Sequence, residues 1–240
     1  MAGLPIYDAL YPDLVSAGGL APAFQQSLDR MGATLNVIGL GKSEFSVYVR
    51  VDLGTRSAHL TVAIHERLFL FDLWRDGVWF GTGLTPDLGE VAFIAKRWVQ
   101  ESCSVNDIEQ MPLVRLTEGA KVFDEGREVE ARWNSFLTGK YRDNEYSEFI
   151  SLASQQPALR MLFPYTSHIT VCFSRCTGYP YSNDCPHVTP IGQGQFEVRM
   201  SGFDGLGVGD AAFAVNLVLK LLSPNSGPAK RGTANSPKDA

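Results

Sequence analysis

Residues 58–80 read AHLTVAIHERLFLFDLWRDGVWF, and this stretch decides the fold. Residues 58–64 alternate between apolar and polar side chains, which is the period of a half-buried strand. From Leu68 to Trp74 the chain is apolar on both sides, as in a strand at the centre of a sheet. Asp76-Gly77 then forms the tight turn of a hairpin, so a partner strand begins at Val78. The stretch therefore predicts consecutive antiparallel strands.

The segments around this stretch extend the sheet and cover it. Residues 44–51, EFSVYVRV, alternate strictly and predict a further strand of the same meander. On the N-terminal side, an apolar stripe predicts a helix over residues 12–31 that stops at Gly32. On the C-terminal side, Thr85-Pro86-Asp87 is typical of a helix start, and the apolar stripe that follows, down to about Gln100, covers one face of the meander.

The second half of the chain repeats the order of strands followed by a helix. Residues 101–130 carry eight acidic and three basic side chains and indicate a connector with a partly helical end. We then expect a helix over Asp143–Ala153, a short turn over Pro157–Leu162, strands over His168–Phe173 and Gln195–Met200, and a helix from Asp210 to about Leu222.

These patterns predict an α+β fold, an antiparallel β-meander with helices packed on one face and two similar strand-then-helix halves. The N-terminal helix, the sheet and its covering helix form residues 1–105. Residues 106–222 hold the second half, either separate from the first or continuous with it. Residues 223–240 consist almost entirely of Pro, Gly, Ser, Asn, Lys and Ala and predict a disordered tail.

Composition and charge exclude several classes of protein. The chain of 240 residues has 45% hydrophobic and 20% charged residues, as a folded domain does. A net charge of −5 argues against a nucleic-acid partner, because phosphate binding needs clustered Lys and Arg. No apolar stretch is long enough to span a membrane, and residues 1–20 lack the features of a signal peptide. We therefore expect a cytoplasmic protein whose four cysteines are free thiols.

Several strings in the chain resemble a known family. They are Tyr11–Leu20 (YPDLVSAGGL), Asp76-Gly77 with Thr85–Leu88 (TPDL), Phe163–His168 (FPYTSH) and Phe173–Tyr181 (FSRCTGYPY). Together they resemble an uncharacterised actinobacterial family known as natural product biosynthesis proteins, over most of residues 10–222. The resemblance implies a setting in natural-product biosynthesis and no particular reaction. Cys176 belongs to the family pattern, whereas Cys172, Cys185 and His187 do not.

Residues 168–187 contain the highest density of potentially metal-binding or catalytic side chains in the chain. Read as metal ligands, Cys172, Cys176, Cys185 and His187 have C-x3-C-x8-C-x-H spacing, which is irregular for a zinc site. Core or loop thiols are the simpler interpretation, so the chain is expected to hold no metal and no cofactor.

Nucleophilic catalysis is a second interpretation of the same segment. Ser167, Ser174 or Cys176 would be the nucleophile, His168 the acid or base, and Asp184 the group that orients it. A buried His168 that binds a backbone carbonyl is the structural alternative.

A third interpretation makes residues 175–186 a recognition loop. Arg175 offers a planar fork for a carboxylate or phosphate, and the tyrosines offer amphipathic contact area. An aromatic loop that caps the core is the structural alternative. The predicted binding residues are Arg175, Tyr179, Tyr181, Thr166, Ser167, Ser174 and Cys176.

Three other features favour structural roles. Asp72 lies in the most apolar strand and must find a partner such as Arg75 or a backbone amide. The glycine-rich run Gly205–Asp210 is only superficially similar to a phosphate-binding turn, because Asp210 would repel a phosphate. The four tryptophans are expected in the core and on sheet faces.

The sequence therefore favours a binding protein over an enzyme. The first expectation is an accessory protein in the biosynthesis of a natural product, for example a ribosomal peptide, that binds a peptide precursor or a partner enzyme. The first alternative is an enzyme that modifies a biosynthetic intermediate, with His168 as acid or base and Arg175 as anion anchor. The second alternative is an immunity-type protein that neutralises a toxin through its acidic surface.

Overall fold

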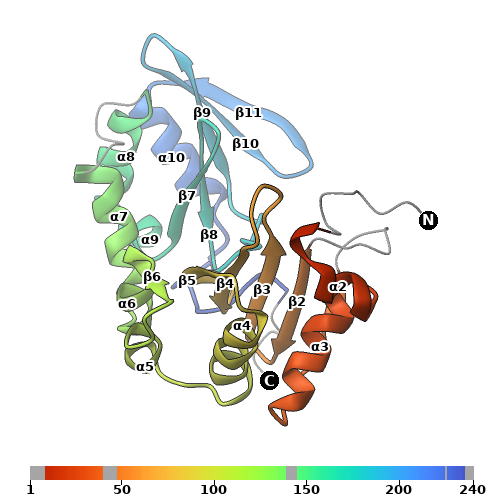
Figure 1. The fold of residues 1–240 in the computed structure, drawn as a ribbon. Coiled ribbons are helices and arrows are strands. Elements are labelled where there is room, and N and C mark those ends of the chain that lie inside the picture. Colours follow the sequence, from red (N-terminus) through yellow and green to blue (C-terminus); the bar gives the residue numbers. More distant parts are fainter. Residues whose placement is uncertain (1–8, 40–47, 139–144, 225, 236–240) are drawn as a thin grey trace. The chain divides into compact units, whose positions relative to one another are not determined.

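The computed structural model describes residues 9–39, 48–138, 145–224 and 226–235. The chain forms two compact units, residues 1–121 and 122–240, and each has an antiparallel sheet with helices against it (Figure 1). The predicted α+β class is confirmed. Residues 106–121, which the sequence assigns to the second half, lie in unit 1. In the described part of the chain, no helix is long and apolar enough to cross a membrane.

The sheet of unit 1 is the predicted meander. Its strands follow one another in space as they do in sequence, and every neighbouring pair is antiparallel. They are β1 (Ile38–Gly39), β2 (Tyr48–Leu53), β3 (Arg56–Val62), β4 (Phe69–Arg75), β5 (Val78–Thr85) and β6 (Arg115–Leu116). The expected strand over residues 44–51 is present as β2 from residue 48, and residues 44–47 lie outside the described residues.

The hairpin between β4 and β5 forms where the sequence predicts it. Asp76 and Gly77 have φ of 54° and 74°, the left-handed pair that a two-residue turn between twisted strands requires. A second glycine, Gly83 in β5, has a different role. A Cβ there would lie 2.2 Å from the Leu113 carbonyl oxygen and 2.2 Å from the Phe71 ring. The missing side chain therefore lets the chain before β6 approach the sheet.

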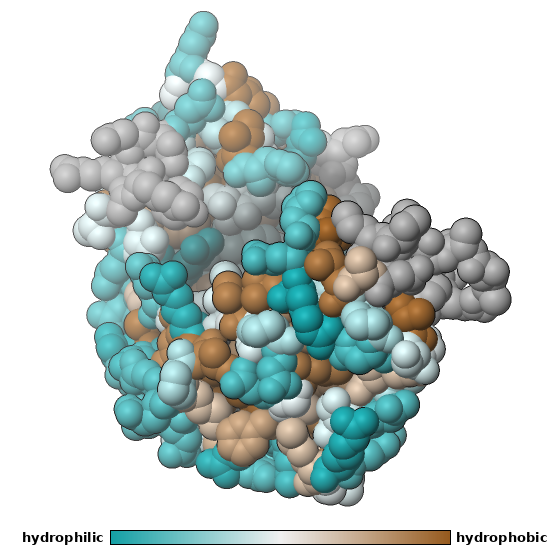
Figure 2. Space-filling model, in the orientation of Figure 1, coloured by the Kyte–Doolittle hydropathy of each residue, from teal (hydrophilic) through white to brown (hydrophobic). Residues whose placement is uncertain are grey.

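Helices cover the face of this sheet from which Phe69, Phe71 and Leu73 project. Those that contact its strands are α3 (Leu20–Arg30), α4 (Leu88–Ala95) and a π-helical turn η1 (Lys96–Gln100), and the unit also holds α2 (Pro12–Ala17) and α5 (Val105–Glu109). Helix α6 (Glu118–Asp124) spans the boundary between the two units. Trp98 in η1 is fully buried and donates from its indole nitrogen to the Trp74 carbonyl at 3.0 Å. Figure 2 shows hydrophobic and hydrophilic side chains interspersed on the surface of this unit.

Two local predictions for these helices need correction. The single helix expected over residues 12–31 is two helices, because Gly18 and Gly19 have φ of 89° and 126° and end α2. Helix α4 is capped by Asp87 rather than Thr85. The Asp87 carboxylate accepts a hydrogen bond from the backbone nitrogen of Gly89 at 2.7 Å.

The sheet of unit 2 is a second antiparallel meander. Its strands are β7 (Phe163–Ser167), β8 (Thr170–Ser174), β9 (His187–Gly192), β10 (Gln195–Met200) and β11 (Phe203–Gly209), in the order β11-β10-β9-β8-β7. The sequence predicts β8 and β10 only. The glycine-rich run at 205–210 is not a turn: its residues up to Gly209 belong to β11.

The helices of unit 2 enclose a second core. They are α7 (Glu128–Thr138), α8 (Ser147–Ala153), α9 (Pro157–Arg160) and α10 (Ala211–Leu221). The predicted Asp210 cap is confirmed, since its carboxylate accepts from the backbone nitrogen of Phe213 at 2.8 Å. Residues 143–144 of the expected helix over 143–153 lie outside the described residues. The largest core side chains are Trp133, Phe136, Phe149, Phe173 and Phe196.

The C-terminal segment, residues 229–234, pairs with the chain instead of forming the expected tail. The Lys230 nitrogen donates to the Arg175 carbonyl at 2.9 Å, and the Lys230 carbonyl accepts from Thr177 at 3.0 Å. A parallel bridge joins Cys176 and Lys230. Composition alone misses this segment because backbone groups, rather than apolar side chains, hold it.

Candidate interaction site

The recognition loop predicted at residues 175–186 connects β8 to β9, and we call it the interaction loop. Ser174, the last residue of β8, is fully buried beneath it. Its hydroxyl accepts from the backbone nitrogens of Cys176 and Ser182 at 3.0 and 3.1 Å and donates to the Cys176 carbonyl at 2.7 Å. The predicted binding residue Ser174 therefore shapes the loop from below and is shielded from a ligand.

The C-terminal segment holds the first half of the interaction loop from the other side. Besides the Lys230 bonds, Gly178 donates to the Gly232 carbonyl at 2.8 Å, and Ala234 donates to the Pro180 carbonyl at 2.8 Å. Arg231 anchors the segment, because its guanidinium binds the Phe123 carbonyl and lies 4.7 Å from the centre of the Phe123 ring. The loop is thus bonded along both sides and is a fixed surface feature.

Three tyrosine rings pack against one another in the site, and one of them is exposed. The rings of Tyr181 and Tyr165 lie 4.4 Å apart between centroids, and the ring of Tyr179 meets Tyr181 edge-on at 5.9 Å. We call Tyr165, Tyr179 and Tyr181 the tyrosine row. Tyr179 is 68% exposed, although the neighbouring backbone is fixed. Tyr165 and Tyr181 are half-buried, so they support Tyr179 as the exposed aromatic contact of the row.

The predicted anion anchor, Arg175, already has an anionic partner. Its guanidinium forms an ion pair with the Asp184 carboxylate from the other end of the loop. Desolvation opposes ionisation of Asp184, but the hydrogen bond from Arg175 prevails and lowers the pKa of the carboxyl. An anion would have to compete with Asp184, so this pair closes the loop rather than offering an open anion site.

His168 lies away from the interaction loop. The prediction that His168 lies in a strand is wrong. It lies in the turn between β7 and β8, where it has φ of 54° and is exposed. Arg175 follows the opposite end of β8. The six residues between them include the whole of β8, and the usual rise of a strand places the two about 20 Å apart. They therefore cannot act together on one small substrate. The expected burial of His168 is also absent.

The other predicted site residues divide between the two ends of the sheet. Thr166 and Ser167 end β7 next to the His168 turn, far from the loop. Cys176 lies inside the loop, where it is buried and its Sγ lies 3.3 Å from the Ser174 hydroxyl. The nucleophile–base–orienter set proposed from sequence is therefore not assembled.

The zinc site considered from the cysteine and histidine spacing is likewise not assembled. Cys172 Sγ lies 3.6 Å from His187 Nδ1, on neighbouring strands. All four cysteines are buried and free. Within the described residues, no group of three His, Cys, Asp or Glu side chains is placed to hold a metal ion. Strand pairing brings Cys172 next to His187, but among the described residues Cys176 and Cys185 do not complete a ligand set with them.

Sequence reasoning missed that Tyr165, Cys172 and His187 form one row across β7, β8 and β9. Burial raises the pKa of the Cys172 thiol and lowers the pKa of His187. Burial, followed by the neighbouring Cys172, also raises the pKa of Tyr165. All three groups are thus neutral at neutral pH. A buried neutral thiol is a poor nucleophile. Cys172 and His187 therefore support Tyr165 of the tyrosine row and do not form a reactive site.

The N-terminal string YPDL has a structural role in unit 1. The buried Tyr11 hydroxyl lies 2.9–3.0 Å from the carbonyl oxygens of Ala63, Glu66 and Leu68, the residues that join β3 to β4. Asp13 holds Arg67 with two hydrogen bonds of 2.7 and 2.9 Å. Together they fix α2 to the β3–β4 connection.

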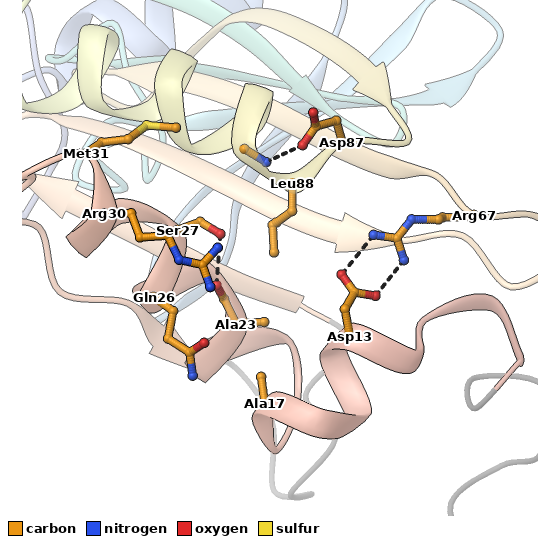
Figure 3. A pocket seen from close by; sticks show the side chains of 11 residues that line it. Asp13, Ala17, Ala23, Gln26, Ser27, Arg30, Met31, Arg67, Asp87 and Leu88 are labelled. Atoms are coloured by element: carbon orange, nitrogen blue, oxygen red, sulfur yellow. Dashed lines mark hydrogen bonds and ion pairs between the residues drawn. The ribbon is translucent and has the colours of Figure 1, made fainter.

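A pocket of about 270 Å³ lies beside this ion pair (Figure 3). Figure 3 shows Arg67 and Asp13 facing each other on one side, with Asp87 turned to the start of α4. The pocket's charged groups thus include two that neutralise each other and one that caps a helix. These contacts account for the charged side chains Asp13, Arg67 and Asp87 of the pocket without a ligand.

Residues 127–233 match a family of unknown function, DUF6193. The match lies within unit 2 and includes the interaction loop and the C-terminal segment up to residue 233. No curated protein and no solved structure matches the chain. The second unit is therefore similar to a family whose activity is unknown, and the function has to be argued from the geometry of the site.

Proposed function

We propose that the protein is an accessory protein of natural-product biosynthesis that binds a peptide precursor or a partner enzyme through the tyrosine row. The observation that carries this proposal is the exposure of Tyr179 on a loop whose backbone is fixed. Tyrosine is a frequent anchor of interfaces because it supplies a large area with few rotatable bonds. A fixed loop lowers the entropic cost of binding further.

The shape of the site favours an extended peptide as the bound segment. The tyrosine row joins the edge strand β7 to the interaction loop, so it offers neighbouring aromatic contacts from two elements. Extended segments are recognised in this way, by side-chain pockets and aromatic faces in a row. The setting in natural-product biosynthesis rests on the resemblance of the sequence strings, and a cytoplasmic setting fits the four free thiols.

Co-expression with the products of neighbouring genes tests the proposal. The protein is recovered by affinity, and native mass spectrometry identifies what accompanies it. We expect a stoichiometric peptide or enzyme, and an affinity at least about tenfold weaker for Tyr179→Ala, the loss of one interface anchor. Phe93→Ala is the matched control, because Phe93 is an aromatic residue on α4 in unit 1 that is 50% exposed.

Two results would contradict the proposal. The protein recovered as a bare monomer would leave the tyrosine row without a partner. Equal loss of binding by Phe93→Ala and Tyr179→Ala would show that binding does not depend on the row. A salt-sensitive complex with a basic toxin, unaffected by Tyr179→Ala, would favour the immunity-type alternative instead.

A further inference from the structure

The face of the unit 1 sheet opposite its helices carries a connected set of polar and aromatic side chains. Across β3 and β4, Ser57 lies opposite Trp74, and His59 lies opposite Asp72. Tyr48 projects onto the same face from β2. We call Tyr48, Ser57, His59, Asp72 and Trp74 the His59 cluster. None of them enters the function proposed above.

Ser57 and His59 have the geometry of a nucleophile and its base. Ser57 Oγ lies 3.1 Å from His59 Nε2, and Tyr48 Oη lies 2.6 Å from His59 Nδ1. With its proton on Nδ1, the imidazole donates to Tyr48 and leaves Nε2 to accept the hydroxyl proton of Ser57. A base bonded to the nucleophile on one side and to an orienting group on the other is the arrangement that activates serine.

The imidazole is held in place and is neutral. The Trp74 ring stacks on it, with centroids 5.6 Å apart and planes inclined by 24°. Burial, and then the charge of Arg50, lower the pKa of His59, so the ring is free to accept a proton at neutral pH. The opposing charge of Asp72 favours the imidazolium that forms on proton transfer. Asp72 is itself fixed by a 3.0 Å bond from the Trp79 indole.

A hydrogen-bond donor without an acceptor belongs to Trp74, the residue that pairs with Ser57 across β3 and β4. The indole nitrogen of Trp74 is buried, and among the described residues it has no hydrogen-bond partner. An unpaired buried donor is costly, and an oxygen that carries developing negative charge would satisfy it. Trp79, directly opposite Trp74 on β5 and 44% exposed, provides an apolar surface beside it.

We propose that Ser57 is the nucleophile, and His59 the base, of a site that hydrolyses a carboxylic ester or thioester. Trp74 donates to the carbonyl oxygen, and Trp79 contacts the apolar acyl group. The proposal concerns unit 1 and is independent of the partner proposed for the tyrosine row.

Each step of the reaction balances with water as the other reactant. Ser57 Oγ bonds to the acyl carbon while its proton passes to His59 Nε2, and the carbonyl electrons move to the oxygen that faces Trp74. The carbon–oxygen or carbon–sulfur bond then breaks, and the leaving group takes the proton from His59. Water attacks the acyl-Ser57 ester, gives a proton to His59, and releases the acid as Ser57 regains its proton.

Labelling of the full chain with a fluorophosphonate tests the nucleophile. We expect one adduct, mapped by peptide mass spectrometry to Ser57, and hydrolysis of p-nitrophenyl butyrate by the same protein. Ser57→Ala should abolish the adduct and lower the hydrolysis rate about a hundredfold, the scale of a lost nucleophile–base pair. Thr61→Ala, on the same strand two residues beyond His59, is the control and should retain both.

Substitution of His59 and Tyr48 separates catalysis from folding. His59→Gln should stop labelling while circular dichroism remains that of the parent. Tyr48 is a positioning residue, so Tyr48→Phe should shift the pH profile of labelling, which Arg50, Asp52 and Asp72 also influence, rather than abolish it. An unlabelled parent protein, or a Ser57→Ala variant labelled as fast as the parent, would overturn the proposal.

Discussion

The backbone nitrogen of Cys176 donates to the hydroxyl of Ser174 at 3.0 Å, and this bond fixes the start of the interaction loop. The same hydroxyl bonds to Ser182, eight residues away, so one buried side chain joins both halves of the loop. The position of Tyr179 between these two contacts therefore depends on a residue that no ligand reaches.

Replacing Ser174 by alanine tests this dependence. Ser174→Ala leaves the backbone donors at residues 176 and 182 without their acceptor. We therefore expect the free energy of unfolding to fall by about 1–3 kcal/mol. Urea unfolding measures the loss, and amide exchange at both donors should accelerate. Ser151→Ala, at an exposed position of α8, should change the stability by less than about 0.5 kcal/mol. Equal exchange rates in Ser174→Ala and the parent would refute the role of Ser174.

Tyr11 provides a second test, in unit 1. Tyr11→Phe removes only the hydroxyl, and the connection between β3 and β4 loses a buried partner of its carbonyl groups. We expect a loss of about 1–3 kcal/mol in the free energy of unfolding. Guanidinium unfolding followed by tryptophan fluorescence measures it. Tyr179→Phe removes an exposed hydroxyl and serves as the comparison, with no measurable loss; a similar loss in both would contradict the assignment.

Alanine substitutions at Gly83 and Gly119 should change the stability in opposite directions. Gly83→Ala places a methyl group 2.2 Å from both the Leu113 carbonyl and the Phe71 ring, so we expect destabilisation of more than about 2 kcal/mol. Gly119 lies in α6 with nothing within 4 Å of an added Cβ. Gly119→Ala should stabilise by about 0.5–1 kcal/mol, because alanine favours the helix. Melting temperatures of the two variants should move in opposite directions.

Acidification should destabilise unit 2 through His187. Its pKa in the folded chain is lowered below the ordinary 6.5 by burial, so the unfolded chain takes up a proton first as the pH falls. Stability is therefore full above pH 6.5 and is lost as the pH falls through the folded pKa. Urea unfolding at several pH values should show a shallower loss in His187→Gln than in the parent. A folded His187 that titrates above 6.5 by NMR would contradict this prediction.

The regular elements follow from the sequence where local signals agree. The alternation in β2 and β3, the Asp76-Gly77 turn and the Asp210 cap each depend on a few neighbouring residues. The strands of unit 2 that sequence reasoning missed, β7, β9 and β11, contain Pro164, Pro190 or several glycines. Such residues disfavour strands locally, and only pairing with the neighbouring strands compensates.

The candidate site shows the same division between local and distant contacts. Sequence reasoning places the interaction loop after the strand β8 but misses β9, the strand that follows it. It does not show that Asp184 neutralises Arg175, or that β8 separates His168 from the loop. Ser57 and His59, two residues apart on one strand, meet through a pattern too common to single out from sequence.

The sequence by itself determined the α+β class, the meander of unit 1 and the position of the loop, because periodicity, turn residues and caps act over a few residues. Only the tertiary structure decided which side chains share a site. Contacts such as Tyr48 with His59, or Lys230 with Arg175, join residues 11 and 55 positions apart, and strand pairing brings them together. Such pairing depends on the whole sheet, since each register is set by the strands on both sides.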